Sequence, residues 1–474
     1  MTDETESLEK NQQDLALGSK KPIQTLFGLS LGPFVTNLVN SAYGFIETFY
    51  FSKAFGDSSL AVLGAVFPMA IITGLLPPYL IAGYGVQLGY LFGQNRSRDV
   101  AQLYVDHLRI AILISVFFAV MVFFATEPLC ILLGASPELA KKGKEYYAPF
   151  GYGSIFSLIM QLTCNLYLTL GKTNVYGAAQ FGYALMNQGI VAPIMLFVLK
   201  TPIWGSQLST AITNAIFALV LTIPIFSKKS DYQPSLGMFF KPFLPETRKA
   251  FIIGIPTLLD VMARLCTPLL VQAYLFSSAQ RKGNYNEVLM IWGVNNKIQI
   301  AVMLLSYTFT ASYIPSASYA LGANNGIRML RLTYHSIWIS CACTIITAGT
   351  FIVFVRQISS IWSKDSLFLN AASEILPVFH YTIWLQGFQT IAQTMVIVMQ
   401  LPIRASIMSV FSYGIPILLF STLMYKIKNN SPAYIIYAYN LTDIWSTFFS
   451  FLCIINPIKL KLNGANAREI FKND

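Results

Sequence analysis

The stretch GAVFPMAIITGLLPPYLIAGYGVQLGYLFGQN (residues 64–95) aligns without a gap on residues 293–324, so that each position pairs with the one numbered 229 higher. Identical pairs include Gly64/Gly293, Ile71/Ile300, Leu75/Leu304, Leu76/Leu305, Ala82/Ala311, Tyr90/Tyr319, Gly93/Gly322 and Asn95/Asn324. Chance matches between apolar residues are common. Two glycines at the same spacing in both copies, followed by a matched asparagine, are harder to obtain by chance. The pattern predicts an internal repeat.

The composition predicts that the chain is a polytopic membrane protein. Of its 474 residues, 55% are hydrophobic and only 11% are charged, whereas soluble domains carry about 25% charged residues. The mean hydropathy is +0.56. The net charge of +11 lies mainly in short connectors, as is typical of charge beside a membrane. We therefore expect membrane lipids as partners and no nucleic acid.

Twelve apolar segments are long enough to cross a bilayer. They lie near residues 24–52, 58–91, 108–128, 147–170, 175–199, 205–227, 250–277, 287–321, 334–355, 375–399, 404–426 and 432–456. The basic connector after the sixth segment divides them into two halves. The predicted organisation is an N-tail (1–22), an N-lobe (23–227), a connector (228–249), a C-lobe (250–457) and a C-tail (458–474).

The repeat sets the expected symmetry of this all-α fold. Six spans per half is an even number, so both halves enter the membrane from the same side. The two lobes are then parallel repeats related by a pseudo-twofold axis along the membrane normal. Two lobes around a central cavity are typical of a secondary transporter.

Basic residues predict the orientation. The side that holds both termini carries 19 Lys and Arg, and the opposite side carries 11. The positive-inside rule then places both termini in the cytoplasm. The C-terminal tail has no retention signal, so the plasma membrane is the expected location.

Three stretches resemble the multidrug and toxic compound extrusion (MATE) family. GFIETFYFSKAFGDSSLAVLGAVFP (44–68) resembles the family's first-helix signature, GYLFGQNRSRDV (89–100) the loop after its second helix, and WGSQLSTAITNAIFALV (204–220) the start of its sixth helix. The resemblance implies an efflux antiporter that exchanges amphipathic organic compounds for H⁺ or Na⁺ by alternating access. We expect a monomer, with an ion gradient in place of a cofactor.

The resemblance also implies roles for individual residues. Glu47 falls where the family carries the acid that couples transport to a cation, and Tyr43 lies one helical turn earlier on the same face. Pro33 matches the proline at which the first helix bends. Asn187 matches the asparagine of an Asn-x-x-x-Asp-Pro motif, but here Ala192 replaces the acid before the proline.

Glu47 also draws attention on physical grounds. A carboxylate at membrane depth costs about 2.5–3.5 kcal/mol on insertion scales. No basic residue lies within a helical turn of Glu47, so partial removal from water favours its protonated form. We expect it to bind a proton or Na⁺, although it could also be an end-of-helix residue that meets lipid headgroups.

Other polar residues are candidates for a cavity wall in the second half. Asp260 and Arg264 are four positions apart and can pair on one helical face, either to make membrane insertion tolerable or to contact substrate. Lys297 lies in a polar cluster with Asn295, and it could instead extend from near the helix start toward water. The candidate cavity residues are Asn187, Asp260, Arg264, Asn295, Lys297 and Gln393, the last because it matches Gln161 at a shift of 232. Asp443 is also an intramembrane acid, with no assigned role.

Other function classes fit less well. A lipid-linked oligosaccharide flippase has the same two-lobe plan and stays open as an alternative, but it would be expected to carry more basic residues in its cavity. A channel would need a repeated filter motif, and none is apparent. Without an HExxH motif, a Walker A motif or a histidine cluster, we expect neither an enzyme nor a metal site.

Overall fold

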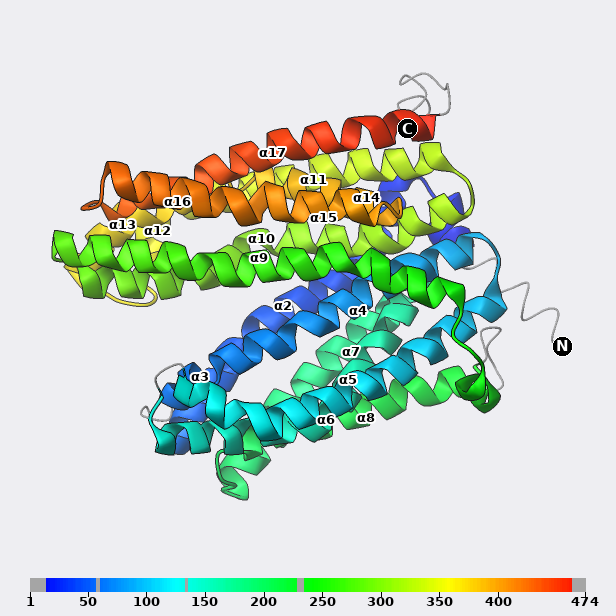
Figure 1. The fold of residues 1–474 in the computed structure, drawn as a ribbon, viewed down its shortest axis with the longest axis horizontal. Helices are drawn as coiled ribbons and strands as arrows, with labels where there is room; N and C mark the ends of the chain where they lie inside the picture. Colours follow the sequence, from blue (N-terminus) through cyan, green and yellow to red (C-terminus); the bar gives the residue numbers. More distant parts are fainter. Residues whose placement is uncertain (1–13, 57–59, 133–134, 228–233, 463–474) are drawn as a thin grey trace. The chain divides into compact units, whose positions relative to one another are not determined.

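The computed structural model describes residues 14–56, 60–132, 135–227 and 234–462. These residues divide into two units, coloured in chain order in Figure 1. Unit 1 holds Gly28–Ile252 together with the described residues up to Ser19, and unit 2 holds Lys20–Phe27 and the described residues from Ile253 onward. Predictions that fall on residues 1–13, 57–59, 133–134, 228–233 and 463–474 lie outside the described residues.

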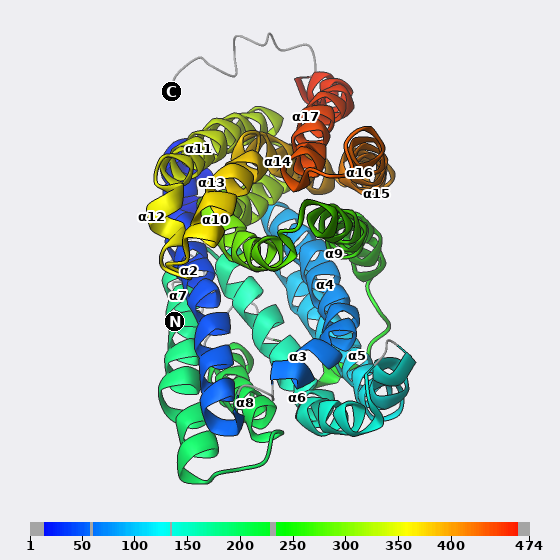
Figure 2. The ribbon, with the colours of Figure 1, turned by 90° about the vertical axis from the view of Figure 1, so that its left-hand side faces the viewer.

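The first half of the chain is helical throughout. Its elements are η1 (Asp14–Ser19), α2 (Pro22–Phe55), α3 (Leu60–Ala65), α4 (Phe67–Gly93), α5 (Ser97–Leu132), α6 (Pro137–Thr169), α7 (Thr173–Met186), η3 (Asn187–Val191), η4 (Ile194–Val198), α8 (Gly205–Phe226) and η5 (Leu236–Phe240). Helix α6 packs beside both α5 and α8, as Figures 1 and 2 show. One buried apolar cluster of this unit includes Phe51, Val62, Met69 and Tyr146.

The second half has the same helical character. Its elements are α9 (Pro245–Lys282), α10 (Tyr285–Gly322), α11 (Gly326–Val353), α12 (Val355–Ser359), α13 (Ser366–His380), α14 (Leu385–Val398), α15 (Pro402–Ser409), η6 (Val410–Gly414), α16 (Ile415–Ile427) and α17 (Pro432–Leu462). Helix α10 packs on α11, and α16 packs on α17 (Figure 2). The largest core residues here include Trp292, Phe379 and Tyr439.

The twelve predicted spans are mainly helical where the structure describes them, with some corrections to their bounds and continuity. Helix α5 runs over residues 97–132, well beyond the predicted 108–128, because its charged first turns are held by contacts that hydropathy does not register. The predicted span 375–399 starts too late and is interrupted, since α13 begins at Ser366 and a break at residues 381–384 separates it from α14. Within the described residues, nine helical segments are long and apolar enough to cross a membrane by composition alone.

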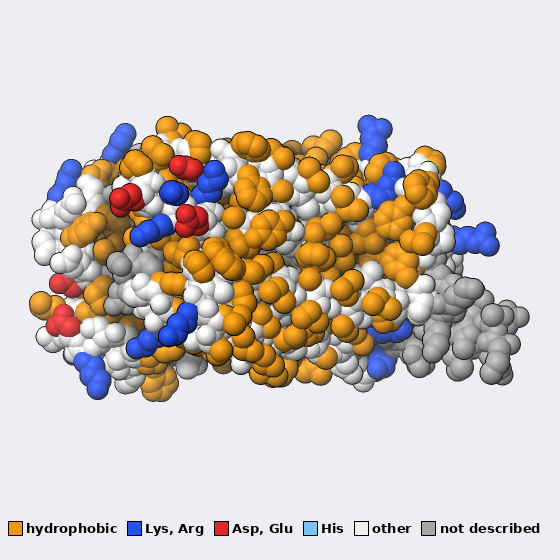
Figure 3. Space-filling model, turned by 90° about the horizontal axis from the view of Figure 1, so that it is seen from below, with side chains coloured by type: hydrophobic (Ala, Val, Ile, Leu, Met, Phe, Trp, Pro, Cys, Tyr) orange, Lys and Arg blue, Asp and Glu red, His pale blue; other side chains and the backbone are white. Residues whose placement is uncertain are grey.

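The exposed surface fits a lipid environment. On α5, large apolar side chains such as Leu113, Phe117 and Phe124 are exposed. On the face drawn in Figure 3, hydrophobic side chains cover the middle, and Lys and Arg gather at the two ends. Apolar surface of this kind is stable in contact with acyl chains, while charged ends lie at the water interfaces.

The repeat reappears in the backbone geometry. Asn95 and Asn324, which the alignment pairs, both take positive φ angles, of 59° and 56°. Gly171 (φ 74°) and Gln400 (φ 59°) form a second such pair in the same register. Helices α6 and α14 end at Thr169 and Val398, which this register also pairs. The register pairs Gln161 with Thr390, so the match of Gln161 with Gln393 at a shift of 232 is wrong.

The first helix of each half begins in the other unit. Lys20–Phe27, which includes the start of α2, belongs to unit 2, where Arg328 donates to the Lys20 carbonyl at 2.8 Å and to Thr25 Oγ1 at 3.1 Å. The first turns of α9 belong to unit 1. Buried Asp106 holds them there, because its Oδ2 accepts from Leu244 N at 2.9 Å and from Thr247 Oγ1 at 2.7 Å.

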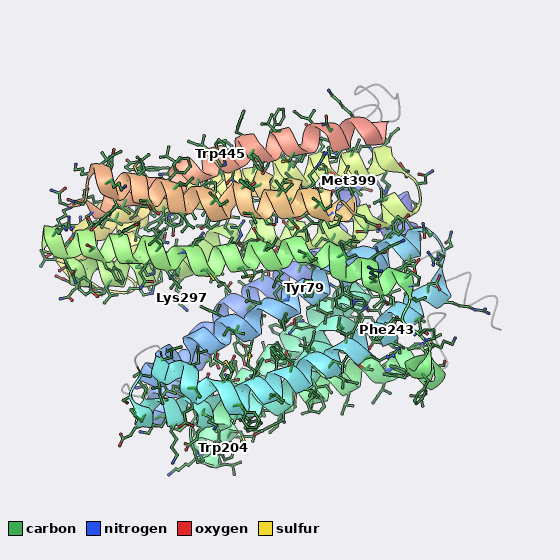
Figure 4. The ribbon with its side chains drawn as sticks, in the orientation of Figure 1. Tyr79, Trp204, Phe243, Lys297, Met399 and Trp445 are labelled. Carbon is green, nitrogen blue, oxygen red and sulfur yellow. The ribbon has the colours of Figure 1, made fainter. Side chains whose placement is uncertain are left out.

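The connector before α9 packs on the same part of unit 1. Arg109 lies over the ring of Phe243, 4.1 Å from its centre, and donates to the Lys241 carbonyl at 2.8 Å. Phe243 is labelled in Figure 4. Arg96 adds an ion pair with Glu246 at 2.9 Å. The end of the predicted connector is therefore an ordered part of unit 1, and α9 begins at Pro245 rather than at residue 250.

Candidate functional site

Glu47 faces a small pocket inside unit 1, together with two other residues that the sequence singles out. Tyr43, Glu47 and Asn187 line it with Tyr50, Gln188, Ala192, Leu196, Ser206, Ser209 and Thr210. The volume of about 10 Å³ corresponds to room for about one water-sized group. The pocket brings the first, fifth and sixth predicted spans together around one carboxyl group.

Hydrogen bonds link Tyr43 to the neighbouring helices. Its hydroxyl lies 3.0 Å from Thr210 Oγ1 and accepts from Asn187 Nδ2. Asn187 Nδ2 also lies 3.2 Å from Thr210 Oγ1, and Thr213 Oγ1 approaches Asn187 Oδ1 at 3.5 Å. The ring of Tyr43 stacks on Tyr183 with a centroid distance of 6.1 Å. This network fixes the orientation of the α2 face that carries Tyr43. Glu47 lies on the same face, one helical turn later.

Local backbone irregularity places Asn187 in this network. Residues Asn187–Val191 form a π turn (η3), followed by Pro193 and a second π turn (η4). Such turns are frequent at functional sites because they rotate side chains out of the regular helical register. The Gln188 carbonyl accepts from the Tyr50 hydroxyl at 3.0 Å. Ala192, which stands where the family motif has an acid, lines the same pocket.

Glu47 is half-buried and has no salt bridge or hydrogen-bond partner among the described residues. No other lining residue carries a charge. A carboxyl group that is partly removed from water and lacks a counter-charge favours its neutral form or a bound cation. Glu47 is therefore the one charge-bearing group among the residues that line this pocket.

Pro33, the predicted hinge, lies inside α2, and a contact from a second helix compensates for the backbone hydrogen bond that proline removes. Proline has no N–H, so the Leu29 carbonyl loses its usual partner in the helix. The Thr173 hydroxyl of α7 donates to this carbonyl at 3.1 Å and accepts from Gly32 N at 3.1 Å. A Cβ on Gly32 would lie 2.5 Å from the Thr173 carbonyl oxygen, so glycine is needed for this approach. Helix α2 continues through the proline with its free carbonyl satisfied.

Asp260 and Arg264 form the expected ion pair on α9. Arg264 Nε lies 3.0 Å from Asp260 Oδ2, and the guanidinium lies 4.9 Å from the ring centre of Tyr413. The Arg264 and Asp260 side chains are partly exposed, at 29% and 21%. The pair therefore makes a charged, accessible spot within unit 2 (its role stays a prediction).

Asp443 occupies a polar site that the sequence did not locate. This carboxylate of α17 is 1% exposed. It accepts from Thr382 Oγ1 at 2.9 Å and from Gln386 Nε2 at 3.1 Å. Asn440 Nδ2 and Gln386 Oε1 are buried nearby without a partner among the described residues. The signal available in the sequence was the acid itself, while these two partners lie 61 and 57 residues away in the chain.

The remaining candidates do not share one wall. Asn295 is buried on α10, and its Oδ1 has no partner among the described residues. Lys297, labelled in Figure 4, is exposed on a different side of the same helix. Gln393 Nε2 donates to Ser409 Oγ at 2.8 Å, and that hydroxyl donates to the Pro256 carbonyl at 2.7 Å. Gln393 therefore connects helices within unit 2.

Comparisons with known proteins identify the family. The MatE family model matches residues 34–188 and 291–423, more than half of the chain. The multidrug export protein MepA of Staphylococcus haemolyticus is 21% identical over 386 residues, which cover 80% of this chain and 82% of that protein. MepA of Staphylococcus saprophyticus is 22% identical with the same coverage.

Solved structures agree on the fold. An outward-facing multidrug resistance MATE transporter superposes with a TM-score of 0.84 at 16% identity, covering 94% of this chain and 97% of that one. A transporter from Pyrococcus furiosus gives a TM-score of 0.85 at 16% identity, with 95% and 98% covered. The predicted all-helical membrane fold of twelve spans in two lobes is confirmed, and so is the expectation of a transporter rather than an enzyme. The chain is a member of the MATE family of membrane transporters.

Proposed function

We propose that this protein exports amphipathic organic compounds in exchange for H⁺ or Na⁺, with Glu47 as the residue that binds the coupling cation. The observation that carries the proposal is the single carboxyl group in a water-sized pocket lined otherwise by uncharged residues. Relatives of this chain are named multidrug export proteins. Their names support export of small organic compounds as the direction and substrate class.

Coupling requires that the cation and the substrate prefer different conformations. Loading Glu47 with a cation removes its charge, and Tyr43 carries this change toward Asn187 and Thr210 through the hydrogen bonds described above. We propose that α2 then bends near Pro33, where Thr173 of a second helix already holds the interrupted backbone. Bending of α2 would change the space available to substrate in unit 1.

Location and orientation complete the proposal. The excess of basic residues on one side supports cytoplasmic termini. The bacterial export proteins among the relatives support the plasma membrane. We propose that the protein works there as a monomer.

The test is efflux of ethidium from proteoliposomes under an imposed pH gradient, an imposed Na⁺ gradient or no gradient. We expect one gradient to drive efflux and Glu47→Gln to abolish it, because the amide cannot exchange a proton or pair with Na⁺. Glu138→Gln is the matched control, since Glu138 is an exposed acid at the start of α6. Normal gradient-driven efflux by Glu47→Gln would refute the role of this residue.

A further inference from the structure

Unit 1 contains a second, larger pocket with an unusually polar lining. Its volume is about 390 Å³. The residues that line it come from α2, α4, α6, α7 and α8: Thr36, Asn40, Ile81, Ser157, Met160, Gln161, Cys164, Asn165, Tyr176, Gln180, Tyr183, Thr210 and Asn214. Five of them are amides, and none carries a charge.

Several of these amides have unused hydrogen-bonding capacity. Asn165 Oδ1 is buried without a partner among the described residues. The side chain of Asn214, which is 8% exposed, also makes no hydrogen bond within the described part of the chain, and neither does that of Asn40, which is exposed. A buried polar group without a partner is costly, so the pocket gains most from a ligand that both donates and accepts hydrogen bonds.

The lining argues against a charged ligand. An ion that leaves water for this pocket loses its hydration and meets no counter-charge there. Aromatic faces could attract a cation, but one face of Tyr183 already stacks on Tyr43, and Phe217 contacts the same ring edge-on. The chemistry of the site therefore favours uncharged ligands.

The size of the pocket further limits the class of ligand that fits it. Its volume lies near the lower end of the range of about 300–1,000 Å³ for small-molecule sites. A nucleoside or a disaccharide has a matching size and presents many hydroxyl groups. Thr210 lines both this pocket and the Glu47 pocket, so a ligand here would lie beside the coupling network.

We propose that this polar pocket of unit 1 binds uncharged, hydroxyl-rich solutes of about nucleoside size in preference to organic cations. The inference rests on the proposed export function and adds a class of ligand for this one pocket of unit 1. A binding measurement tests it separately from transport.

The experiment is equilibrium dialysis of the purified full-length protein in lipid nanodiscs with radiolabelled uridine, thymidine or cellobiose, and with tetraphenylphosphonium as the cation. We expect at least one uncharged solute to bind more tightly than the cation. Asn165→Leu and Asn214→Leu should each weaken that binding about 10-fold or more. Asn174→Leu, at an exposed position of α7 outside the pocket, should bind like the unmodified protein.

A further variant, Gly85→Ala, changes the pocket while keeping the Asn165 side chain, so it helps to separate lost binding from misfolding. The Cβ of Gly85→Ala would lie 2.8 Å from Asn165 Oδ1 and would displace this amide without removing it. We expect it to weaken binding as well. The inference is overturned if none of the three uncharged solutes binds, or if Asn165→Leu, Asn214→Leu and Gly85→Ala all bind with unchanged affinity. If ethidium efflux still depends on Glu47 in that case, the proposed export function stands.

Discussion

Replacing Thr173 by valine tests whether its hydroxyl satisfies the backbone of α2 that Pro33 leaves without a partner. Valine has nearly the shape of threonine, so the substitution leaves no cavity beside Gly32. It removes the hydroxyl that donates to the Leu29 carbonyl and accepts from Gly32 N, each at 3.1 Å. Leu29 is 2% exposed, so water cannot easily replace the lost partner at its carbonyl.

The magnitude follows from these two hydrogen bonds. Side-chain hydrogen bonds inside membrane proteins average about 0.6 kcal/mol, which gives a lower value of about 1 kcal/mol for two. A buried group left without a partner costs about 1–3 kcal/mol. We therefore expect a loss of about 1–3 kcal/mol in the free energy of unfolding. At about 2–4 °C per kcal/mol for a large domain, the melting temperature falls by roughly 2–12 °C.

The assay is thermal unfolding of the purified protein, followed by fluorescence-detected size exclusion. Thr173→Ser is the matched control, because it keeps the hydroxyl and loses only a methyl group. We expect the serine variant to melt close to the unmodified protein and the valine variant clearly below it. Equal melting temperatures for the valine and serine variants would show that Thr173 does not satisfy the interrupted backbone.

Three further predictions concern stability and are read out by thermal unfolding. Asp106→Asn should cost about 1–3 kcal/mol, since its new Nδ2 donor would face the Leu244 N–H, which can only donate, and it should expose residues 234–247 to protease. Asp443→Asn should be tolerated while Asp443→Leu costs about 2 kcal/mol or more, because leucine leaves buried donors unpaired. Gln400→Gly should stabilise the protein by about 0.5–1 kcal/mol, because Gln400 has φ 59° where the equivalent Gly171 avoids that strain.

Each of these predictions has an outcome that would contradict it. An Asp106→Asn variant with unchanged melting and protease resistance would mean that the start of α9 is held by other contacts. Equal melting of the asparagine and leucine variants at position 443 would show that the hydrogen bonds there contribute little. A lower melting temperature for Gln400→Gly would mean that the Gln400 side chain stabilises its turn.

The candidate site shows which functional residues can be predicted from the sequence and which cannot. Glu47, Tyr43 and Asn187 were predicted through a family resemblance, and the structure brings them to one pocket. The polar cluster around Asn295 and Lys297 does not form one wall, because residues two apart on a helix face different sides. The Asp443 site escaped prediction because Thr382 and Gln386 lie outside its own helix, and only folding brings them close.

The sequence by itself determined the membrane class, the twelve spans and the repeat. These properties depend on local hydrophobicity and on turn residues, which a chain displays without folding. Tertiary structure alone decided that Asn187 donates to Tyr43, 144 residues earlier. It also decided that the Thr173 hydroxyl donates to the Leu29 carbonyl, which Pro33 leaves without a partner in the helix. It decided, too, that five amide side chains line one pocket without charged residues. Those contacts depend on the rotation and depth at which helices pack, and hydropathy carries no information on either.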